Sequence, residues 1–262
     1  MYKFRLWCFP TVKIGCIIPA HLKSVRFPKK ILFKIKGLEM IEHVRRRALL
    51  SYHLQNKVYV ASGDSQILSI IKKNNGKTIK TFKNHLNGMS RVAEAIKKTD
   101  FTHVIILQGD EPLIYPEYIN KFIQQIKKDR KNNIDSWNLI SPINNFKDLK
   151  KKSFVKTKLS KYNHVKSLDR VYNEKNKNKV YKILGLIALK RKALFKLIRL
   201  KPTINEKKKY IEQLRIIENN MTLKGVKVQL ALPSINEKKD LKKVLEVLCI
   251  NKVQKRIFNK IF

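Results

Sequence analysis

The N-terminal half of the sequence alternates short apolar runs with segments of helical periodicity, and this alternation constrains the fold more than any other feature. Apolar runs predict strands at 13–20, 57–62, 77–82 and 103–109, and apolar residues at helical spacing predict helices at 40–54, 64–73, 90–98 and 116–128. Asp64 and Ser90 are predicted N-caps, and Pro116 is predicted in a first turn. Because strands that alternate with helices form a mostly parallel sheet covered on both faces, we expect an α/β fold.

The pattern changes after about residue 135. Segments 137–143 and 153–170 are typical of extended chain joined by turns, which predicts an antiparallel lobe inserted at about 145–182. Further strands are predicted at 181–189 and 226–232, and helices are predicted up to residue 200, over 207–220 and from 238 onward. We therefore expect one domain over 13–262, preceded by an N-terminal extension at 1–12.

The composition excludes several classes of protein. A hydrophobic fraction of 43% is enough for a core. No apolar run approaches the ~18 residues of a membrane span, and the N-terminus lacks the features of a secretory signal. Cys8, Cys16 and Cys249 lack metal-ligand spacing, which favours a reduced, cytoplasmic compartment. Cys16 lies in an apolar run, where we expect it to be buried.

The formal net charge is +40, from 59 Lys and Arg against 19 Asp and Glu. Such an excess could indicate a nucleic-acid-binding protein, because Lys and Arg neutralise phosphates. A second interpretation is compositional drift, and a third is a need to bind polyanionic small molecules. The excess is mostly Lys and is spread over every segment, which favours drift, so we do not expect a nucleic-acid partner.

Two predicted loops carry polar residues where parallel strands end at their carboxyl edge, which is where such sheets bind ligands. The loop within 18–32 could hold a triphosphate or be a solvated basic loop, and it presents His21, Lys23, Arg26, Lys29 and Lys30. It lacks the spacing of a P-loop. In QGDEP, Asp110 could bind Mg²⁺ with phosphate oxygens completing the octahedron, or it could cap the next turn.

Two further stretches are less specific. Gly88 precedes a predicted helix and permits a tight turn that can bind an anion or read a base edge. Glu212 and Gln213 are adjacent polar residues in an otherwise apolar helical pattern, which a solvated face would also explain.

Together these stretches resemble the CMP-Kdo synthetases, or 3-deoxy-manno-octulosonate cytidylyltransferases, over residues 14–248. IPAHLKSVRFPKKIL resembles the family's IPAR-x-x-S-T-R-(L/F)-P-x-K-x-L, NHLNGMSRVAEA resembles DH-x-SGTDR-x-AE, LQGDEPLI resembles VQGDEP(L/F)I, and IEQLRIIENN resembles LEQLR-x-LENG. The stretch 153–170 places Arg170 on a motif Arg, and LPSINEKKDLKKV places Asn236 on the Asp of PGVDTPEDLE-x-V.

The resemblance implies a Rossmann-like three-layer nucleotidyltransferase fold of the nucleotide-diphospho-sugar transferase type, and a homodimer formed through the inserted lobe. It implies that CTP and a 3-deoxy sugar acid, Kdo, react with Mg²⁺ to give CMP-Kdo and pyrophosphate for lipopolysaccharide synthesis. The implied catalytic residues are Asp110, Arg26 and Lys30; the implied nucleotide-binding residues are Pro19, Ala20, His21, Arg26, Lys30, Gly88 and Arg91; the sugar-binding residues are Gln108, Arg170, Glu212 and Gln213; and the metal ligands are Asp110 and Asn236.

The sequence departs from the family pattern at several of these positions. His21 replaces the Arg of IPAR, and Asn236 replaces a metal-binding Asp. Ile183, Ile187 and Leu189 replace polar groups of a family strand, which suggests an apolar sugar-facing shell. Two alternatives therefore stay open: a cytidylyltransferase for a different, less polar sugar acid, and a non-catalytic paralogue.

Overall fold

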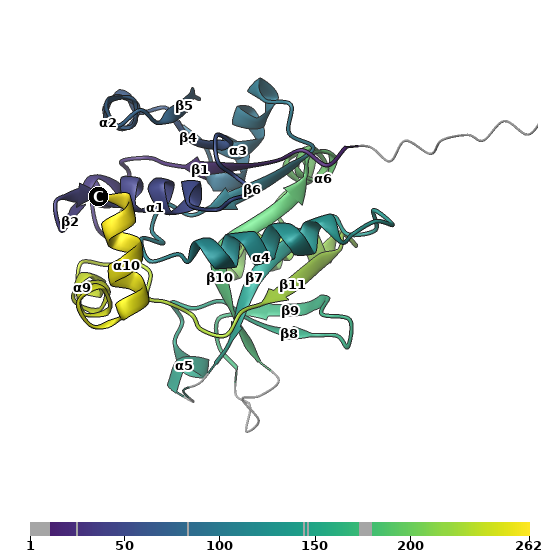
Figure 1. Ribbon diagram of the computed structural model, residues 1–262. Coiled ribbons are helices and arrows are strands. Elements are labelled where there is room, and N and C mark those ends of the chain that lie inside the picture. The colour runs from purple at the N-terminus through teal and green to yellow at the C-terminus, as the bar shows by residue number, and fades with distance from the viewer. Residues whose placement is uncertain (1–10, 25, 83, 144, 146, 173–179) are drawn as a thin grey trace, which may run out of the picture.

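The computed structural model describes residues 11–24, 26–82, 84–143, 145, 147–172 and 180–262, so Cys8 and most of the expected N-terminal extension lie outside the described residues. Within this part of the chain, the larger sheet has nine strands (Figure 1). Seven follow the order β11-β7-β10-β6-β1-β4-β5, and β8 and β9 branch from β10. The strands are β1 (Ile14–Pro19), β4 (Val58–Ser62), β5 (Lys77–Lys80), β6 (His103–Leu107), β7 (Ser136–Pro142), β8 (Lys156–Leu159), β9 (Val165–Asp169), β10 (Tyr181–Lys190) and β11 (Leu223–Lys227), and the short pair β2 (Lys34–Ile35) and β3 (Leu38–Glu39) forms a second sheet.

The pairing confirms a mostly parallel sheet. Parallel ladders join β5 to β4, β4 to β1, β1 to β6, and β7 to β11. The sequence pattern did not reveal that β10 lies antiparallel between β6 and β7. As expected, the inserted segment is antiparallel: β8 pairs with β9 and with the beginning of β10.

Helices cover both faces of the sheet, so the three-layer α/β prediction is confirmed. They are α1 (Met40–Leu49), α2 (Ser65–Lys73), α3 (Gly88–Ala95), α4 (Pro116–Lys127), α5 (Lys147–Lys150), α6 (Arg191–Arg199), α7 (Ile204–Lys209), α8 (Leu214–Glu218), α9 (Asp240–Ile250) and α10 (Lys252–Ile261). One core cluster joins the sheet to α1, α2 and α4. In Figure 1, α4 crosses in front of β7 and β10, α1 lies beside β1, and α2 lies next to β5. The other cluster joins the opposite face to α3, α6 and α8.

The central strands are apolar at successive positions because both faces are buried. In β1, Cys16 and Ile18 face the first cluster and Ile17 faces the second. Cys16 is fully buried, as predicted, and this burial raises the pKa of its thiol.

Two helix starts differ from the sequence prediction in their capping chemistry. Asp64 is the N-cap residue of α2, but its carboxylate makes no capping hydrogen bond and instead accepts the Leu22 N–H at 3.0 Å. Helix α3 begins at Gly88, and Asn87 is its N-cap; Ser90 is the third helical residue and bonds back to Asn87 in a capping box. Pro116 lies in the first turn of α4, as predicted.

The C-terminal elements differ more. The helix predicted at 207–220 is broken at Tyr210, where φ is +52°, and the break lets Arg215 of α8 bond back to the nearly buried Glu206 of α7. Strand β11 (Leu223–Lys227) begins and ends earlier than the predicted 226–232, because the chain leaves β7 after Val228. The predicted last helix is two helices, α9 and α10, separated at Asn251, which caps α10.

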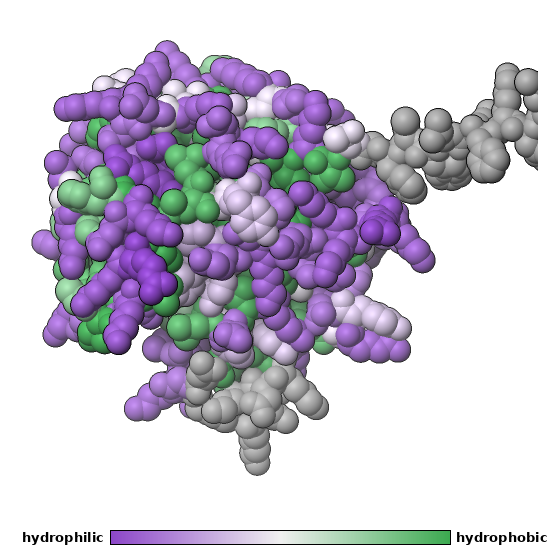
Figure 2. All heavy atoms as spheres, in the orientation of Figure 1, coloured by the Kyte–Doolittle hydropathy of each residue, from purple (hydrophilic) through white to green (hydrophobic). Residues whose placement is uncertain are grey.

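The surface in the view of Figure 2 is predominantly hydrophilic, and its apolar residues lie in small separate patches. Among the described residues, no helix has both the length and the apolar character needed to cross a membrane. The C-terminus lies beside α1, where Arg46 donates a hydrogen bond to the Ile261 carbonyl at 2.7 Å (Figure 1).

Candidate active site

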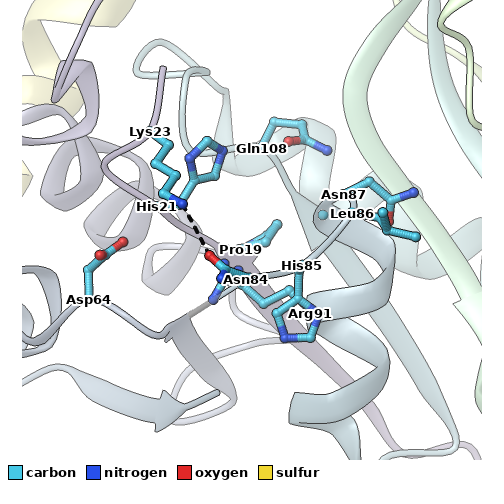
Figure 3. A pocket seen from close by; sticks show the side chains of 11 residues that line it. Pro19, His21, Lys23, Asp64, Asn84, His85, Leu86, Asn87, Arg91 and Gln108 are labelled. Atoms are coloured by element: carbon cyan, nitrogen blue, oxygen red, sulfur yellow. Dashed lines mark hydrogen bonds between the residues drawn. The ribbon is translucent and has the colours of Figure 1, made fainter. Parts of the chain in front are cut away.

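A cavity of about 340 Å³ opens at the carboxyl ends of β1, β4 and β6 (Figure 3). This is the edge at which parallel α/β sheets bind their ligands. Five of the predicted site residues line it together: Pro19, His21, Gly88, Arg91 and Gln108. The other lining residues are Lys23, Asp64, Asn84, His85, Leu86 and Asn87.

Backbone geometry sets one wall of the cavity. Pro19 ends β1, and a Cβ atom at Gly88 would lie 3.3 Å from its ring. A side chain at Gly88 would therefore crowd Pro19, and glycine lets the start of α3 approach the strand. Ala20, also predicted at this site, is fully buried and contributes its backbone, since its N–H donates to the Ala61 carbonyl at 2.9 Å.

Arg91 is nearly buried and holds the loop between β5 and α3. Its Nη1 donates to Thr81 Oγ1 at 2.7 Å and to the Phe82 carbonyl at 3.1 Å. His85 from the same loop lies 2.7 Å from Glu94 and 3.2 Å from Ser90 Oγ. The loop that lines the cavity is therefore fixed by side chains of the helix that follows it.

Asp64, Asn84 and Leu86 line the cavity but were not predicted as site residues, whereas Lys23 belongs to the predicted basic loop. Asp64 anchors the loop after β1 through the Leu22 N–H, and Lys23 Nζ donates to Asn84 Oδ1 at 3.1 Å, which is the dashed contact in Figure 3. Asp64 follows the carboxyl end of β4, and this position alone could have identified it. Asn84 and Leu86 lie in the stretch NHLNGMSRVAEA, which was singled out from the sequence through Gly88 and Arg91, although these two side chains were not themselves predicted.

His21 lies close to positive charge. Partial burial lowers the pKa of its imidazole below the ordinary value of 6.5, and Arg91 and Lys30 lower it further, whereas Asp64 raises it. The imidazole is therefore mostly neutral at pH 7, whereas the Arg of the family motif would be charged at this pH.

A second group of predicted residues gathers where the QGDEP turn meets the loop before α9. Lys30 Nζ donates to Asp110 Oδ2 at 2.7 Å and to the Ile235 carbonyl at 3.1 Å, and the Ile235 N–H donates to the Asp110 carbonyl at 3.0 Å. This bond holds Ile235, the residue before Asn236, against the Asp110 backbone. Arg26 reaches the same loop, 3.7 Å from Glu237.

The donors present suit Mg²⁺ only if a substrate supplies further oxygens. Asp110 offers one carboxylate, with 24% of its side chain exposed, and Asn236 offers an amide oxygen. No group of three His, Cys, Asp or Glu within the described residues could hold a metal ion. Proteins commonly bind Mg²⁺ through one or two carboxylates together with substrate phosphates, and these residues fit that arrangement.

Of the residues predicted to bind the sugar acid, Gln108 lines the cavity described above, and Arg170, Glu212 and Gln213 are partly buried. Gln213 Nε2 lies 3.4 Å from Oδ1 of the buried Asn138. Burial, and secondarily Glu206, raises the pKa of Glu212 to about 7, while Arg215 opposes this. Glu212 and Arg215 line a small hollow of about 50 Å³ together with Leu86, Asn87, Met89, Ser90, Leu197 and Ile198.

Arg170 is already engaged by the protein. Its guanidinium donates to the carbonyls of Lys209, Lys152 and Tyr210 at 2.7, 2.9 and 2.8 Å. These bonds join the loop before β8 to the end of α7. Binding of a sugar carboxylate by Arg170 stays a prediction, because it would require exchange of at least one of these bonds.

Two of the three apolar replacements in β10 do not form a sugar-facing shell. Ile187 and Leu189 are buried in the core cluster that joins the sheet to α3 and α6, and Ile183 packs against the same cluster. The interpretation that these replacements make the sugar pocket apolar was therefore wrong for Ile187 and Leu189, and for the partly buried Ile183 it stays a prediction. Inside β10 they face a helix layer, and the sequence could not show which face that was.

Comparison with known proteins agrees with the geometry. A family model described as cytidylyltransferase matches residues 15–240. The 3-deoxy-manno-octulosonate cytidylyltransferase of Fusobacterium nucleatum is 32% identical, with 91% of this chain and 98% of that protein covered. The enzyme of the same name from Geotalea daltonii is 30% identical, with 90% and 98% covered.

Solved structures give the same result. A CMP:2-keto-3-deoxy-manno-octonic acid synthetase, solved in complex with CTP, superimposes with a TM-score of 0.84 at 27% identity, covering 90% of this chain and 98% of that one. A cytidylyltransferase from Leptospira borgpetersenii shares the fold at 15% identity, with a TM-score of 0.65 and coverage of 96% and 93%. The chain therefore belongs to the cytidylyltransferase family and, within it, to the 3-deoxy-manno-octulosonate cytidylyltransferases.

Proposed function

We propose that the protein transfers the cytidylyl group of CTP to Kdo, giving CMP-Kdo and pyrophosphate for lipopolysaccharide synthesis. The observation that carries this proposal is the convergence of the basic loop after β1 and the QGDEP turn, joined by the 2.7 Å contact between Lys30 and Asp110 beside the cavity. The bound CTP of the similar solved synthetase supports it. The anomeric hydroxyl of Kdo loses its proton to solvent and its oxygen bonds to the α-phosphorus of CTP. The bond from that phosphorus to the pyrophosphate oxygen breaks, and pyrophosphate leaves.

The chain's own residues bind and orient the two substrates. Arg26 and Lys30 neutralise phosphate charge, and His21 gains a proton as the triphosphate approaches. Gly88 and Arg91 border the part of the cavity that takes cytosine and ribose. This positioning and charge neutralisation supply most of the rate enhancement expected for such a displacement.

Asp110 and Asn236 would hold Mg²⁺ once phosphate oxygens are present. The ion would supply further neutralisation of the triphosphate. The structure pairs Lys30 with Asp110. With the substrate and the ion present, Asp110 would help to hold the ion, and Lys30 would bind a phosphate oxygen.

The test is pyrophosphate release from CTP and Mg²⁺, measured with and without Kdo. Release that requires Kdo, with CMP-Kdo identified by mass spectrometry, is the expected result. Release with another 3-deoxy sugar acid but not with Kdo would contradict the assigned substrate. Measurable CTP binding without any turnover would favour a non-catalytic paralogue.

We also propose a cytoplasmic homodimer formed through the lobe at 145–182. The antiparallel pairing of β8 with β9 and β10 and the free thiols of Cys16 and Cys249 are consistent with this proposal. Light scattering coupled to gel filtration should give twice the mass of 30.9 kDa. A monomer at micromolar concentration would contradict the dimer and leave the catalytic proposal unaffected.

A further inference from the structure

Strand β10 is irregular in its middle, next to the active site. Its register with β7 shifts between Ile183 and Ile187, and Gly185 lies in this bulge. Both polar backbone groups of Gly185 bind the turn that follows β6: the Gln108 N–H donates to its carbonyl at 2.9 Å, and its own N–H donates to Glu111 Oε1 at 3.2 Å. Bulges often lie beside active sites, where they redirect the chain.

Glu111 and Gly185 fit each other closely. A Cβ atom at Gly185 would lie 2.5 Å from Glu111 Oε1 and 2.6 Å from its Cγ. The Glu111 side chain therefore occupies the space that a side chain at position 185 would need. The Glu111 carboxylate therefore connects the bulge in β10 to the turn that carries Asp110, the preceding residue in the chain.

Asn138 holds the same bulge from the other side. It is fully buried in β7, and its Nδ2 donates to the carbonyls of Leu184 and Leu186 at 3.0 and 3.1 Å. These carbonyls flank Gly185. An apolar residue at position 138 would leave both without this donor, and unsatisfied buried polar groups are costly.

Asn138 also contacts Gln213, a residue assigned to the sugar acid: its Oδ1 accepts a hydrogen bond from Gln213 Nε2 at 3.4 Å. We propose that Glu111 and Asn138 are positioning residues, which hold the bulge at Gly185 and so fix Gln213, on the sugar-acid side, relative to Asp110, on the phosphate side. This inference rests on the proposed function, which assigns these two residues to the two substrates. Neither Glu111 nor Asn138 needs to touch a reacting atom.

Four variants test the inference: Glu111→Ala, Glu111→Gln, Asn138→Leu and, as a matched control, Ser141→Ala. Ser141 is fully buried in the same strand as Asn138, and its Oγ has no hydrogen-bond partner among the described residues. For each variant we would measure Kdo-dependent turnover, the Kd for CTP without sugar, and hydrogen exchange of the Gly185 amide by NMR.

Glu111→Ala and Asn138→Leu should lower kcat/KM for Kdo by about 100-fold, the loss that a misplacement of about 1 Å can cause. Their Kd for CTP should stay within about twofold of wild type, since the cavity walls that bind the nucleotide are not changed. Glu111→Gln retains an oxygen that can accept the Gly185 N–H, so it should stay within about fivefold of wild type. The Gly185 amide should exchange faster in Glu111→Ala and not in Ser141→Ala.

The inference is overturned if Glu111→Gln is as impaired as Glu111→Ala, or if CTP affinity falls in parallel with turnover. If Glu111→Ala does not fold, amide exchange is measured on wild type and Glu111→Gln. A Gly185 amide that exchanges as fast as the amides of exposed loops would refute the proposal that Glu111 and Asn138 hold the bulge. Failure of the wild-type protein to form CMP-Kdo would refute the proposed function instead. In that case amide exchange and CTP binding would still test whether Glu111 and Asn138 hold the bulge at Gly185.

Discussion

Replacement of Asp110 by Asn should have opposite effects on CTP binding and on turnover. Lys30 Nζ lies 2.7 Å from Asp110 Oδ2, and only 18% and 24% of the two side chains are exposed. A hydrogen bond between charged groups contributes about 1.5–3 kcal/mol, and CTP must compete with this bond for Lys30. The variant Asp110→Asn weakens that competition and also removes a negative charge near the triphosphate.

We expect Asp110→Asn to bind CTP more tightly in the absence of metal. Water and the Asn oxygen recover part of the lost interaction, so a net gain of about 1 kcal/mol, or about fivefold in Kd, is realistic. Turnover with Mg²⁺ and Kdo should fall by at least about 10³-fold, because the metal loses its charged protein ligand. Isothermal titration with CTP in EDTA, and pyrophosphate release with Mg²⁺, measure the two effects.

Asp100→Asn is the matched control. Asp100 also forms an ion pair at 2.7 Å, with Lys13, but its side chain is 70% exposed and lies near the opposite end of β1 and β6. It removes the same unit charge from the protein, so it should change neither CTP affinity nor turnover. Weaker binding of CTP by Asp110→Asn in the absence of metal would show that Asp110 does not compete with CTP for Lys30, and it would refute the reasoning.

The remaining predictions concern the metal site, the phosphate loop, acid stability and core packing. Asn236→Asp should leave turnover equal or higher and lower the Mg²⁺ concentration needed for half-maximal rate, because it adds a carboxylate beside Asp110; a severe loss of activity would mean that position 236 does not face the metal. The pKa of His21 lies below 6.5, so the wild-type KM for CTP should decrease as pH falls below that value. His21→Arg should have a lower KM for CTP than wild type at pH 8, and its KM should depend less on pH. If KM varies with pH in the same way in both proteins, His21 does not bind phosphate. Burial lowers the pKa of His43 to about 4, so the unfolded protein takes up a proton more readily than the folded one below about pH 6.5. The free energy of unfolding should therefore fall by up to about 3 kcal/mol as pH falls from 6.5 toward 4. Urea unfolding should show a lower midpoint at pH 5 than at pH 7.5, and equal midpoints would contradict this. In Gly15→Ala the new Cβ atom would lie 2.0 Å from the ring of Phe101. This overlap should lower the free energy of unfolding by about 1–3 kcal/mol, which thermal unfolding can measure. An unchanged melting temperature would show that Phe101 moves aside without cost.

Much of the fold could be predicted from the sequence, because local chain properties encode it. The strands at 14–19 and 103–107 are buried on both faces and are therefore continuously apolar, and the helices between them carry one apolar stripe each. The polar residues at the ends of these strands, His21 and Gln108, could be assigned to a site because parallel strands end at a common edge.

Several boundaries could not be predicted, because side chains formed contacts that local patterns do not show. Asp64 stands at the start of α2 but bonds to Leu22 across the loop instead of capping the helix. Periodicity predicted one helix over 207–220, but the chain breaks at Tyr210, and the pairing of Arg215 with Glu206 of the preceding helix stabilises the break.

The sequence by itself determined the α/β architecture, the edge of the sheet at which ligands bind and the family motifs, since each depends on residues close together in the chain. Only the tertiary structure decided which face of β10 Ile187 and Leu189 occupy, that Arg170 is bound to backbone carbonyls, and that Lys30 neutralises Asp110. These features arise from the pairing and register of segments far apart in the sequence. Composition and periodicity do not record register, and a strand bulge such as that at Gly185 changes it without a local signal.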